Sequence, residues 1–194
     1  MSSLIRPAIV LLVIMTLLTG VAYPFVITGI AQVLFPDKAN GSIVVKNGKA
    51  VGSRLIGQSF ADPKYLWSRP SASTPQPYNG LGSTGSNLGP LNSALTDAIK
   101  QHVDALHAAD PSNKAPIPAD LVTASGSGLD PEISLAAAYY QEARVARVRG
   151  VATAVVHNLI ETHAQGRVLG FLGEPRVNVL EVNLALDQLN APKP

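Results

Sequence analysis

The sequence PAIVLLVIMTLLTGVAYPFVITGIAQVLF occupies residues 7–35 and contains no charged side chain. It is longer than the roughly 20 residues that an α-helix needs to cross the hydrocarbon of a bilayer. A buried helix of a soluble protein is a poor alternative, because it would have to be apolar on every face at the extreme end of the chain. The sequence therefore predicts a transmembrane helix over 7–35, between a short N-terminus (1–6) and a domain (36–194). Gly20 and Pro24 are expected to bend this helix.

A cleaved signal peptide is the main alternative to an uncleaved anchor. The chain begins with a short basic segment, residues 8–19 would form the apolar region, and Gly20 and Ala22 resemble the small residues of a cleavage site. However, the apolar run continues past that site as far as Phe35. This extra length favours a helix that stays in the membrane.

The charges that flank the apolar run leave its orientation open. Only Arg6 and the α-amino group precede it, whereas Lys38, Lys46, Lys49 and Arg54 follow it. The positive-inside rule, taken literally, would keep the domain in the cytoplasm, but long translocated domains override that rule. The absence of cysteine agrees with an exported domain that has no disulfides.

The domain is almost neutral. All 13 acidic residues and all but one of the 15 basic residues follow the apolar run. Such a balance disfavours nucleic acid as the main partner, because nucleic-acid-binding surfaces need a large excess of basic residues. The chain as a whole is only 14% charged and 46% hydrophobic, so the domain has enough apolar residues for a small core.

The patterns along the domain predict an α+β fold. Residues 42–57 read as a β-hairpin that turns at Asn47-Gly48, and a long loop rich in Gly, Pro, Ser and Asn follows it. Further elements are expected at 90–111 (helix), 119–122 (short strand), 125–150 (helix capped by Asp130-Pro131), 151–166 (helix) and 180–187 (strand). The last assignment rests on a strict alternation of apolar and polar residues in LEVNLALD.

The segment GLGSTG (80–85) fits the letters of a dinucleotide-binding turn. That motif requires a hydrophobic strand directly before it, but the preceding residues PSASTPQPYN contain three prolines and cannot be that strand. A phosphate-binding loop would need Lys and then Ser or Thr after the second glycine, where this chain has Ser86-Asn87. The glycines are therefore read as permitting tight turns and close approach of the backbone, with a small anion site at the following helix as a minor possibility.

No other motif specifies an active site. The histidine pairs 102/107 and 157/163 lack the i, i+4 spacing that places two imidazoles on one metal. The segment ASGSG (124–128) misses the first glycine of a nucleophile elbow. Arg144, Arg147 and Arg149 are expected to form a basic helix face, which would dock an acidic partner or simply be solvated. We expect no catalytic residue and no metal ligand.

Five segments in order resemble the signature blocks of the C subunit of the Kdp-type potassium-transporting ATPase. They are WSRPSAS (67–73), YNGLGSTGSNLGP (78–90), TASGSGLDPEIS (123–134), QEARVARVRG (141–150) and GEPRVNVLEVNLALD (173–187). The similarity covers most of the chain, including the N-terminal span. Five ordered blocks are far more specific than any one of them. The departures are minor and fall at Pro131-Glu132 and at the TPQP insert (74–77).

The resemblance implies a single-pass subunit of a bacterial inner-membrane complex that takes up potassium at the expense of ATP. Its N-terminus would lie in the cytoplasm and its domain in the periplasm. The implied partners are a channel-like potassium-translocating subunit, a P-type ATP-hydrolysing subunit, a small single-span subunit and the lipid bilayer, with no nucleic acid. ATP and Mg²⁺ would act only at the level of the complex, and potassium would be the transported ion.

Subunits of this family are described as non-catalytic chaperones that raise the ATP affinity of the ATPase subunit. A periplasmic domain cannot reach cytoplasmic ATP, so we expect it to stabilise assembly and to cap the entrance of the potassium pathway, with any effect on ATP transmitted through the membrane helices. The candidates for a nucleotide-linked role are Ser127, Gly128 and Gln141. The candidates for partner contact are Asn79, Gly80, Gly82, Asn87, Arg144 and Arg147.

Two other classes of function stay open. A membrane-tethered periplasmic enzyme would have to use a nucleophile such as Ser127. A periplasmic ligand-binding module would bind a small molecule, for instance an anion.

Overall fold

The computed structural model describes residues 2–189. The first residue of the predicted N-terminal segment (1–6) and the last five residues of the predicted domain (36–194) lie outside the described residues. The chain separates into two units that divide between Val51 and Gly52. Each unit is described by itself. An apolar N-terminal helix followed by a mixed helix-and-sheet domain confirms the predicted α+β class.

The first unit begins with one long apolar helix, made of α1 (Ser2–Leu17), a π-helical turn η1 (Leu18–Ala22) and α2 (Tyr23–Leu34). The stretch Ser3–Leu34 has 32 residues, a mean hydropathy of 2.4 in its most apolar window, and none of that window is buried. Its length and composition suffice for one membrane span.

The π-helical turn lies where the sequence predicts an irregularity. Tyr23 donates its backbone N–H to the carbonyl of Leu18, five residues back. Pro24 has no N–H, and its ring would press on the carbonyl of Gly20 in a regular α-helix. Widening the turn relieves that pressure while the helix continues.

A short helix, α3 (Pro36–Ala39), and the hairpin of β1 (Ile43–Lys46) and β2 (Lys49–Ser53) follow. Asn47 and Gly48 both have positive φ, 52° and 75°. These two angles are typical of the tight turn that matches the twist of paired strands. The predicted hairpin at 42–57 is confirmed.

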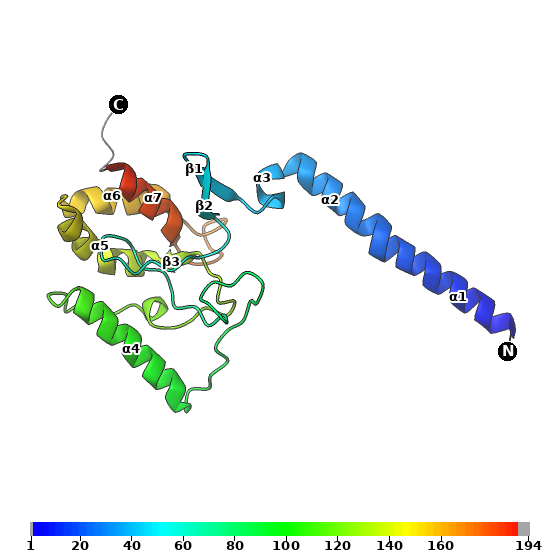
Figure 1. Cartoon of the computed structure of the whole chain (residues 1–194), viewed down its shortest axis with the longest axis horizontal. Coiled ribbons are helices and arrows are strands. Elements are labelled where there is room, and N and C mark those ends of the chain that lie inside the picture. Colours follow the sequence, from blue (N-terminus) through cyan, green and yellow to red (C-terminus); the bar gives the residue numbers. More distant parts are fainter. Residues whose placement is uncertain (1, 190–194) are drawn as a thin grey trace. The chain divides into compact units, whose positions relative to one another are not determined.

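The second unit places three helices against a small sheet, with α4 on the other side of long loops (Figure 1). Its elements are α4 (Ser93–Ala109), η2 (Ala119–Leu121), β3 (Glu132–Ser134), α5 (Leu135–Arg149), α6 (Thr153–His163), β4 (Ala164–Gln165), β5 (Arg176–Asn178) and α7 (Val179–Leu189). The sheet is antiparallel in the order β3-β5-β4, with Val177 opposite both Ile133 and Ala164. Helix α6 packs against α5 and α7, and side chains from all three helices and the sheet form the core.

Helix α4 confirms the predicted helix at 90–111. The side chain of Asn92 accepts a hydrogen bond from the N–H of Ala94 (3.0 Å) and so caps the beginning of the helix. The helix ends at Ala109, directly before Asp110-Pro111.

The prediction of a strand at 180–187 is wrong, because this segment forms most of helix α7. The buried residues of α7 are Val179, Leu180, Val182, Asn183 and Leu186. Their spacing is helical, but the set contains a polar member, Asn183. An alternation of period two fits the same short window, and the buried asparagine hid the helical period.

Two smaller predictions are also wrong. Residues 119–122 form the 3₁₀ turn η2 instead of a strand. Helix α5 begins after Ser134, whose hydroxyl accepts from the N–H of Ala137 (3.0 Å), and not at Asp130-Pro131. The carboxylate of Asp130 does accept a backbone N–H, that of Glu132 (3.0 Å), but the chain then enters β3.

Candidate functional site: loops gathered around residues 66–73

The centre of the candidate site is an extended segment, residues 66–73, which we call the central segment. Its first two residues pair with side-chain amides instead of a neighbouring strand. Asn183 of α7 accepts from the N–H of Leu66 (2.8 Å) and donates to its carbonyl (2.9 Å). Gln141 of α5 does the same for Trp67, at 2.8 Å and 3.2 Å. Because both amides are buried, they do here what a partner strand does in a sheet.

Arg144 supports this arrangement from inside the domain. Its guanidinium lies over the ring of Trp67, 4.7 Å from the centroid, and donates to Gln141 Oε1 (2.7 Å) and to the carbonyl of Pro63. Burial lowers the pKa of Arg144 to about 10, so the side chain stays charged at neutral pH. A buried cation needs such partners, because an unpaired one would be very costly.

The prediction of an exposed arginine face is therefore wrong at two of its three positions. Arg144 is 2% exposed. Arg149, whose side chain is 3% exposed, binds Asp187 (3.0 Å) and the carbonyls of Lys64 (2.7 Å) and Leu186 (2.8 Å). Arg147 alone keeps a half-exposed side chain, and it pairs with Asp110 (2.8 Å).

The second half of the central segment joins two loops, which we call the glycine loop (residues 78–90) and the serine loop (residues 123–130). The hydroxyl of Ser71 donates to the carbonyl of Gly128 (2.6 Å) and accepts from the N–H of Tyr78 (2.9 Å). The hydroxyl of Ser73 accepts from the N–H of Asn79 (2.9 Å). Two serine side chains thus tie the three segments together.

The glycines allow the two loops to touch. A Cβ on Gly85 would lie 3.0 Å from the carbonyl oxygen of Gly126, and one on Gly128 would lie 2.6 Å from that of Thr84. Gly128 also has a φ of +66°, which L side chains rarely adopt. Between the loops, Thr84 donates its N–H to the carbonyl of Ser127 (3.0 Å). Close backbone contact is the physical role of glycine at these positions.

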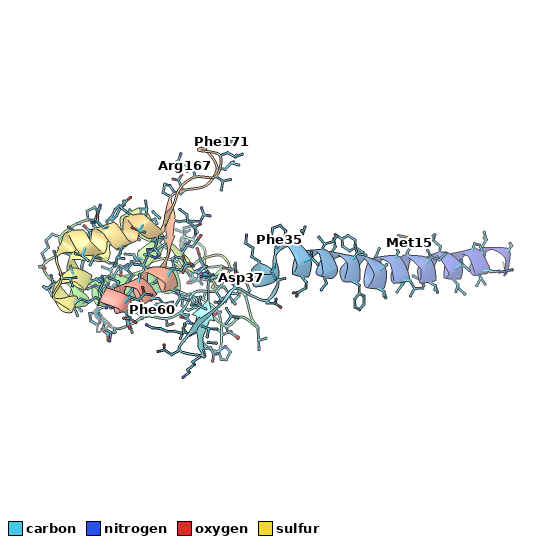
Figure 2. The ribbon with its side chains drawn as sticks, turned by 90° about the horizontal axis from the view of Figure 1, so that it is seen from above. Met15, Phe35, Asp37, Phe60, Arg167 and Phe171 are labelled. Atoms are coloured by element: carbon cyan, nitrogen blue, oxygen red, sulfur yellow. The ribbon has the colours of Figure 1, made fainter. Side chains whose placement is uncertain are left out.

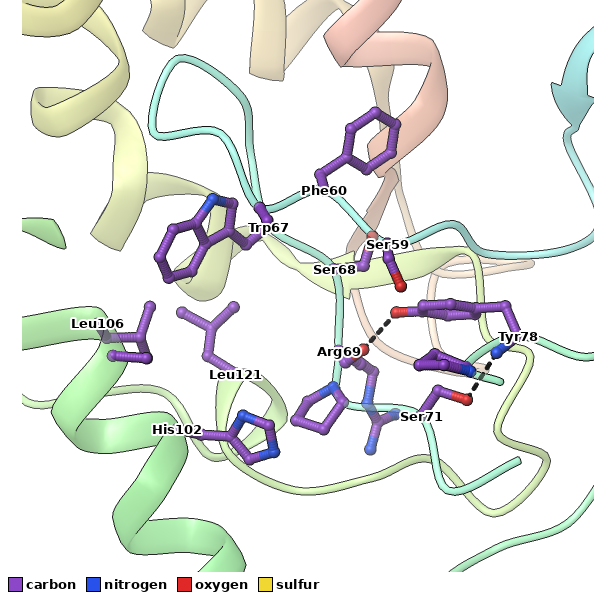
Figure 3. A pocket seen from close by; sticks show the side chains of 14 residues that line it. Ser59, Phe60, Trp67, Ser68, Arg69, Ser71, Tyr78, His102, Leu106 and Leu121 are labelled. Carbon is purple, nitrogen blue, oxygen red and sulfur yellow. Dashed lines mark hydrogen bonds between the residues drawn. The ribbon is translucent and has the colours of Figure 1, made fainter. Parts of the chain in front are cut away.

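A cavity of about 250 Å³ opens between the central segment and α4 (Figure 3). Figure 3 shows Trp67, Leu106 and Leu121 at one side of it and Arg69, Ser71 and Tyr78 at the other, with His102 of α4 between them. Burial lowers the pKa of His102, which favours its neutral form at pH 7. The walls are mainly apolar and aromatic, with Arg69 held to Asp130 (3.0 Å).

The structure separates the nucleotide-linked candidates. Ser127 and Gly128 lie in the serine loop, where their carbonyls accept from Thr84 and Ser71. Gln141 is 1% exposed and uses both ends of its amide on the central segment. It is a structural residue of the interior and faces no loop surface.

The side chains of Ser127, His157 and His163 make separate hydrogen bonds. Within the described residues, no hydrogen bond joins a serine to a histidine: His157 bonds to Glu142 (3.0 Å) and His163 to the carbonyl of Leu159 (2.8 Å). Over the same part of the chain, no three His, Cys, Asp or Glu residues are grouped as metal ligands would be. The hydroxyl of Ser127, the nucleophile of the enzyme alternative, accepts from the N–H of Leu129 (3.1 Å).

The partner-contact candidates of the glycine loop differ in their exposure and in the hydrogen bonds that they already make within the loop. The amide of Asn79 is engaged within the loop, with the carbonyl of Thr74 (2.7 Å) and the N–H of Leu81 (3.1 Å). Gly80 and Asn87 are exposed, whereas Gly82 is half-buried.

Leu81 and Leu91 are the most exposed leucines of this surface, at 100% and 99%. The helical spacing of apolar residues predicts Leu91 as part of the helix at 90–111, but α4 begins at Ser93 and Leu91 stays exposed before it. Leu81 was not singled out from the sequence. The signal for Leu81 was its position among glycine, serine and asparagine, with no apolar residue beside it in the sequence.

Comparison with known proteins identifies the family. Residues 5–188 match the family model described as KdpC, the c chain of the K⁺-transporting ATPase. The potassium-transporting ATPase KdpC subunit of Variovorax paradoxus is 61% identical over 96% of this chain and 97% of its own length. Its counterparts from Dechloromonas aromatica (98% of this chain, 100% of its own length) and Methylococcus capsulatus (95% and 97%) are each 59% identical. The resemblance seen in the sequence is confirmed: the chain belongs to the KdpC family.

Proposed function

We propose that this chain is the accessory, non-catalytic subunit of an ATP-driven potassium-uptake complex, and that the glycine and serine loops form its contact surface for the potassium-translocating subunit. In this proposal the helix Ser3–Leu34 spans the inner membrane once and the second unit lies in the periplasm. Membership of the KdpC family supports the assignment to the complex.

One observation carries the choice of surface. The glycine loop is fixed by hydrogen bonds to the serine loop and to the central segment, yet Leu81 on this loop and Leu91 directly after it are fully exposed. A loop that is rigid before binding loses little conformational entropy in a complex. Exposed leucines on such a loop gain free energy only when a partner covers them.

The same geometry argues against direct action on ATP. The polar groups of Ser127, Gly128 and Gln141 are used within the domain, and a lysine for phosphates is missing from the glycine loop. We propose that any effect on the ATPase subunit is a coupling free energy transmitted through the assembled membrane helices. Capping of the pathway entrance would follow from docking of the loops there.

The test is to replace Leu81 by Asp in the tagged chain and to purify the complex in mild detergent. We expect recovery of the potassium-translocating subunit to fall about tenfold, which corresponds to a loss of about 1.4 kcal/mol, a cost that residues at the centre of an interface reach. Potassium-stimulated ATP hydrolysis per tagged chain should fall in parallel.

Val148→Asp is the matched control, because Val148 is an exposed apolar residue (49%) on α5, outside the loops. It should leave both recovery and hydrolysis unchanged. Normal assembly of the Leu81→Asp complex, or equal losses for both variants, would exclude the loops as the contact surface.

A further inference from the structure

The segment between β4 and β5 carries a second exposed apolar surface, which no step of the proposed function uses. Figure 2 shows Arg167 and Phe171 on a hairpin that stands away from the body of its own unit. We call residues 168–173 (VLGFLG) the hairpin cap. Its large side chains are exposed as follows: Val168 55%, Leu169 79%, Phe171 69% and Leu172 50%.

The hairpin cap is an ordered structure. Val168 and Leu172 exchange both backbone hydrogen bonds at 2.9 Å, Gly170 donates to the carbonyl of Arg167 (3.2 Å), and Phe171 donates to that of Val168 (3.3 Å). Leu169 has a φ of +54°, a conformation that is uncommon for a leucine. Leu169 thus combines an unfavourable backbone conformation with a side chain that is 79% exposed.

Charges are confined to the stem of the hairpin. Arg167 pairs with Glu174 (2.7 Å), and no charged residue lies between them. The tip of the hairpin is therefore apolar and uncharged, and the ion pair between Arg167 and Glu174 lies at its base. This distribution is typical of elements that lie in a membrane interface.

Four of the six backbone N–H groups of the cap are paired within the hairpin. Hydrocarbon offers no hydrogen-bond partners, so an inserted segment must satisfy its N–H groups internally. The N–H groups of Val168, Gly170, Phe171 and Leu172 already meet this demand. Residues 35–51 connect this domain to the helix that is long enough to span a bilayer, so the chain tethers the domain to that helix.

We propose that the hairpin cap is a membrane-contact element, whose apolar side chains enter the interface of the bilayer on the domain's side. It would act as a second, reversible anchor besides the N-terminal helix. This inference does not depend on the glycine loop or on the identity of its partner.

The test uses the full-length chain in phosphatidylcholine vesicles, prepared with or without bromine on acyl carbons close to the headgroups. Bromine quenches tryptophan only at short range. The unsubstituted chain contains a single tryptophan, Trp67, whose emission is subtracted as background. Phe171→Trp reports on the cap, and Leu81→Trp is the control, because Leu81 is fully exposed on the glycine loop instead.

We expect brominated lipid to quench the emission of Phe171→Trp strongly and to leave that of Leu81→Trp almost unchanged. Equal emission of Phe171→Trp in the two kinds of vesicle would overturn the proposal. So would equal quenching of both variants, which would mean that the whole domain collapses on the surface. A blue shift of Phe171→Trp that needs the other subunits and resists bromine would assign the cap to a protein groove.

Discussion

The central segment and the hairpin cap both depart from the usual rule that polar residues are exposed and apolar residues are buried. The first has buried polar residues around it, whereas the second exposes apolar ones. Around the central segment, an asparagine, a glutamine and an arginine are buried at 2%, 1% and 2% exposure. In the hairpin cap, two leucines, a valine and a phenylalanine are left in solvent.

The contacts explain the difference. Asn183, Gln141 and Arg144 are buried because each binds backbone groups or side chains that would otherwise be unpaired. Their role is complete within this chain. The large side chains of the cap each leave half or more of their surface exposed, so their role is not to fill the core of their own unit. Buried polar groups with all bonds made indicate structure, whereas exposed apolar groups on an ordered hairpin indicate a surface to be covered.

Replacing Asn183 by Leu removes one of the buried amides that bind the central segment, and it should have the largest effect on the free energy of unfolding. The N–H and carbonyl of Leu66 would lose both partners in the interior, and each unsatisfied backbone group costs roughly 1–3 kcal/mol, so we expect a loss of about 2–6 kcal/mol of unfolding free energy. Urea unfolding of the full chain in detergent measures it. Asn158→Leu, at an exposed position of α6, is the control and should change little.

A methyl group on Gly128 tests whether the loops really depend on close backbone contact. The new Cβ would lie 2.6 Å from the carbonyl oxygen of Thr84 at a φ of +66°. Gly128→Ala should therefore cost about 1–3 kcal/mol. Gly126→Ala in the same loop meets nothing within 4 Å and should stay within about 0.5 kcal/mol. Equal thermal midpoints for the two variants would contradict the proposed packing.

Replacing Phe171 by Ser tests whether the exposed side chains of the hairpin cap contribute to folding, and it should have the smallest effect on stability. Phe171 is 69% exposed, so its removal should change the unfolding free energy by no more than about 0.5 kcal/mol in detergent. A large destabilisation would show that the cap belongs to the fold after all. Unfolding of the Phe171→Ser chain, measured under the same conditions as the Asn183→Leu chain, makes the comparison direct.

Sequence alone predicted the features that rest on local rules. The uncharged run at 7–35 requires only length and hydropathy, the turn at Asn47-Gly48 requires positive φ, and α4 requires a helical period and a proline after it. Five ordered blocks of residues were enough to identify the family. The sequence also argued against a nucleotide fingerprint at 80–85, because the strand and the lysine that such sites need are missing.

The tertiary structure decided what the polar residues do. The segment around Asn183 was predicted as a strand, and Arg144 and Arg149 were predicted on an exposed basic face that would dock a partner or be solvated. Both predictions failed because a sequence window does not show which distant backbone group a side chain will bind. Asn183 and Leu66 are 117 positions apart, as the chain is numbered. The exposure of Leu81, Leu91 and the hairpin cap is likewise a property of the folded chain, since whether an apolar residue is covered depends on what the rest of the chain places beside it.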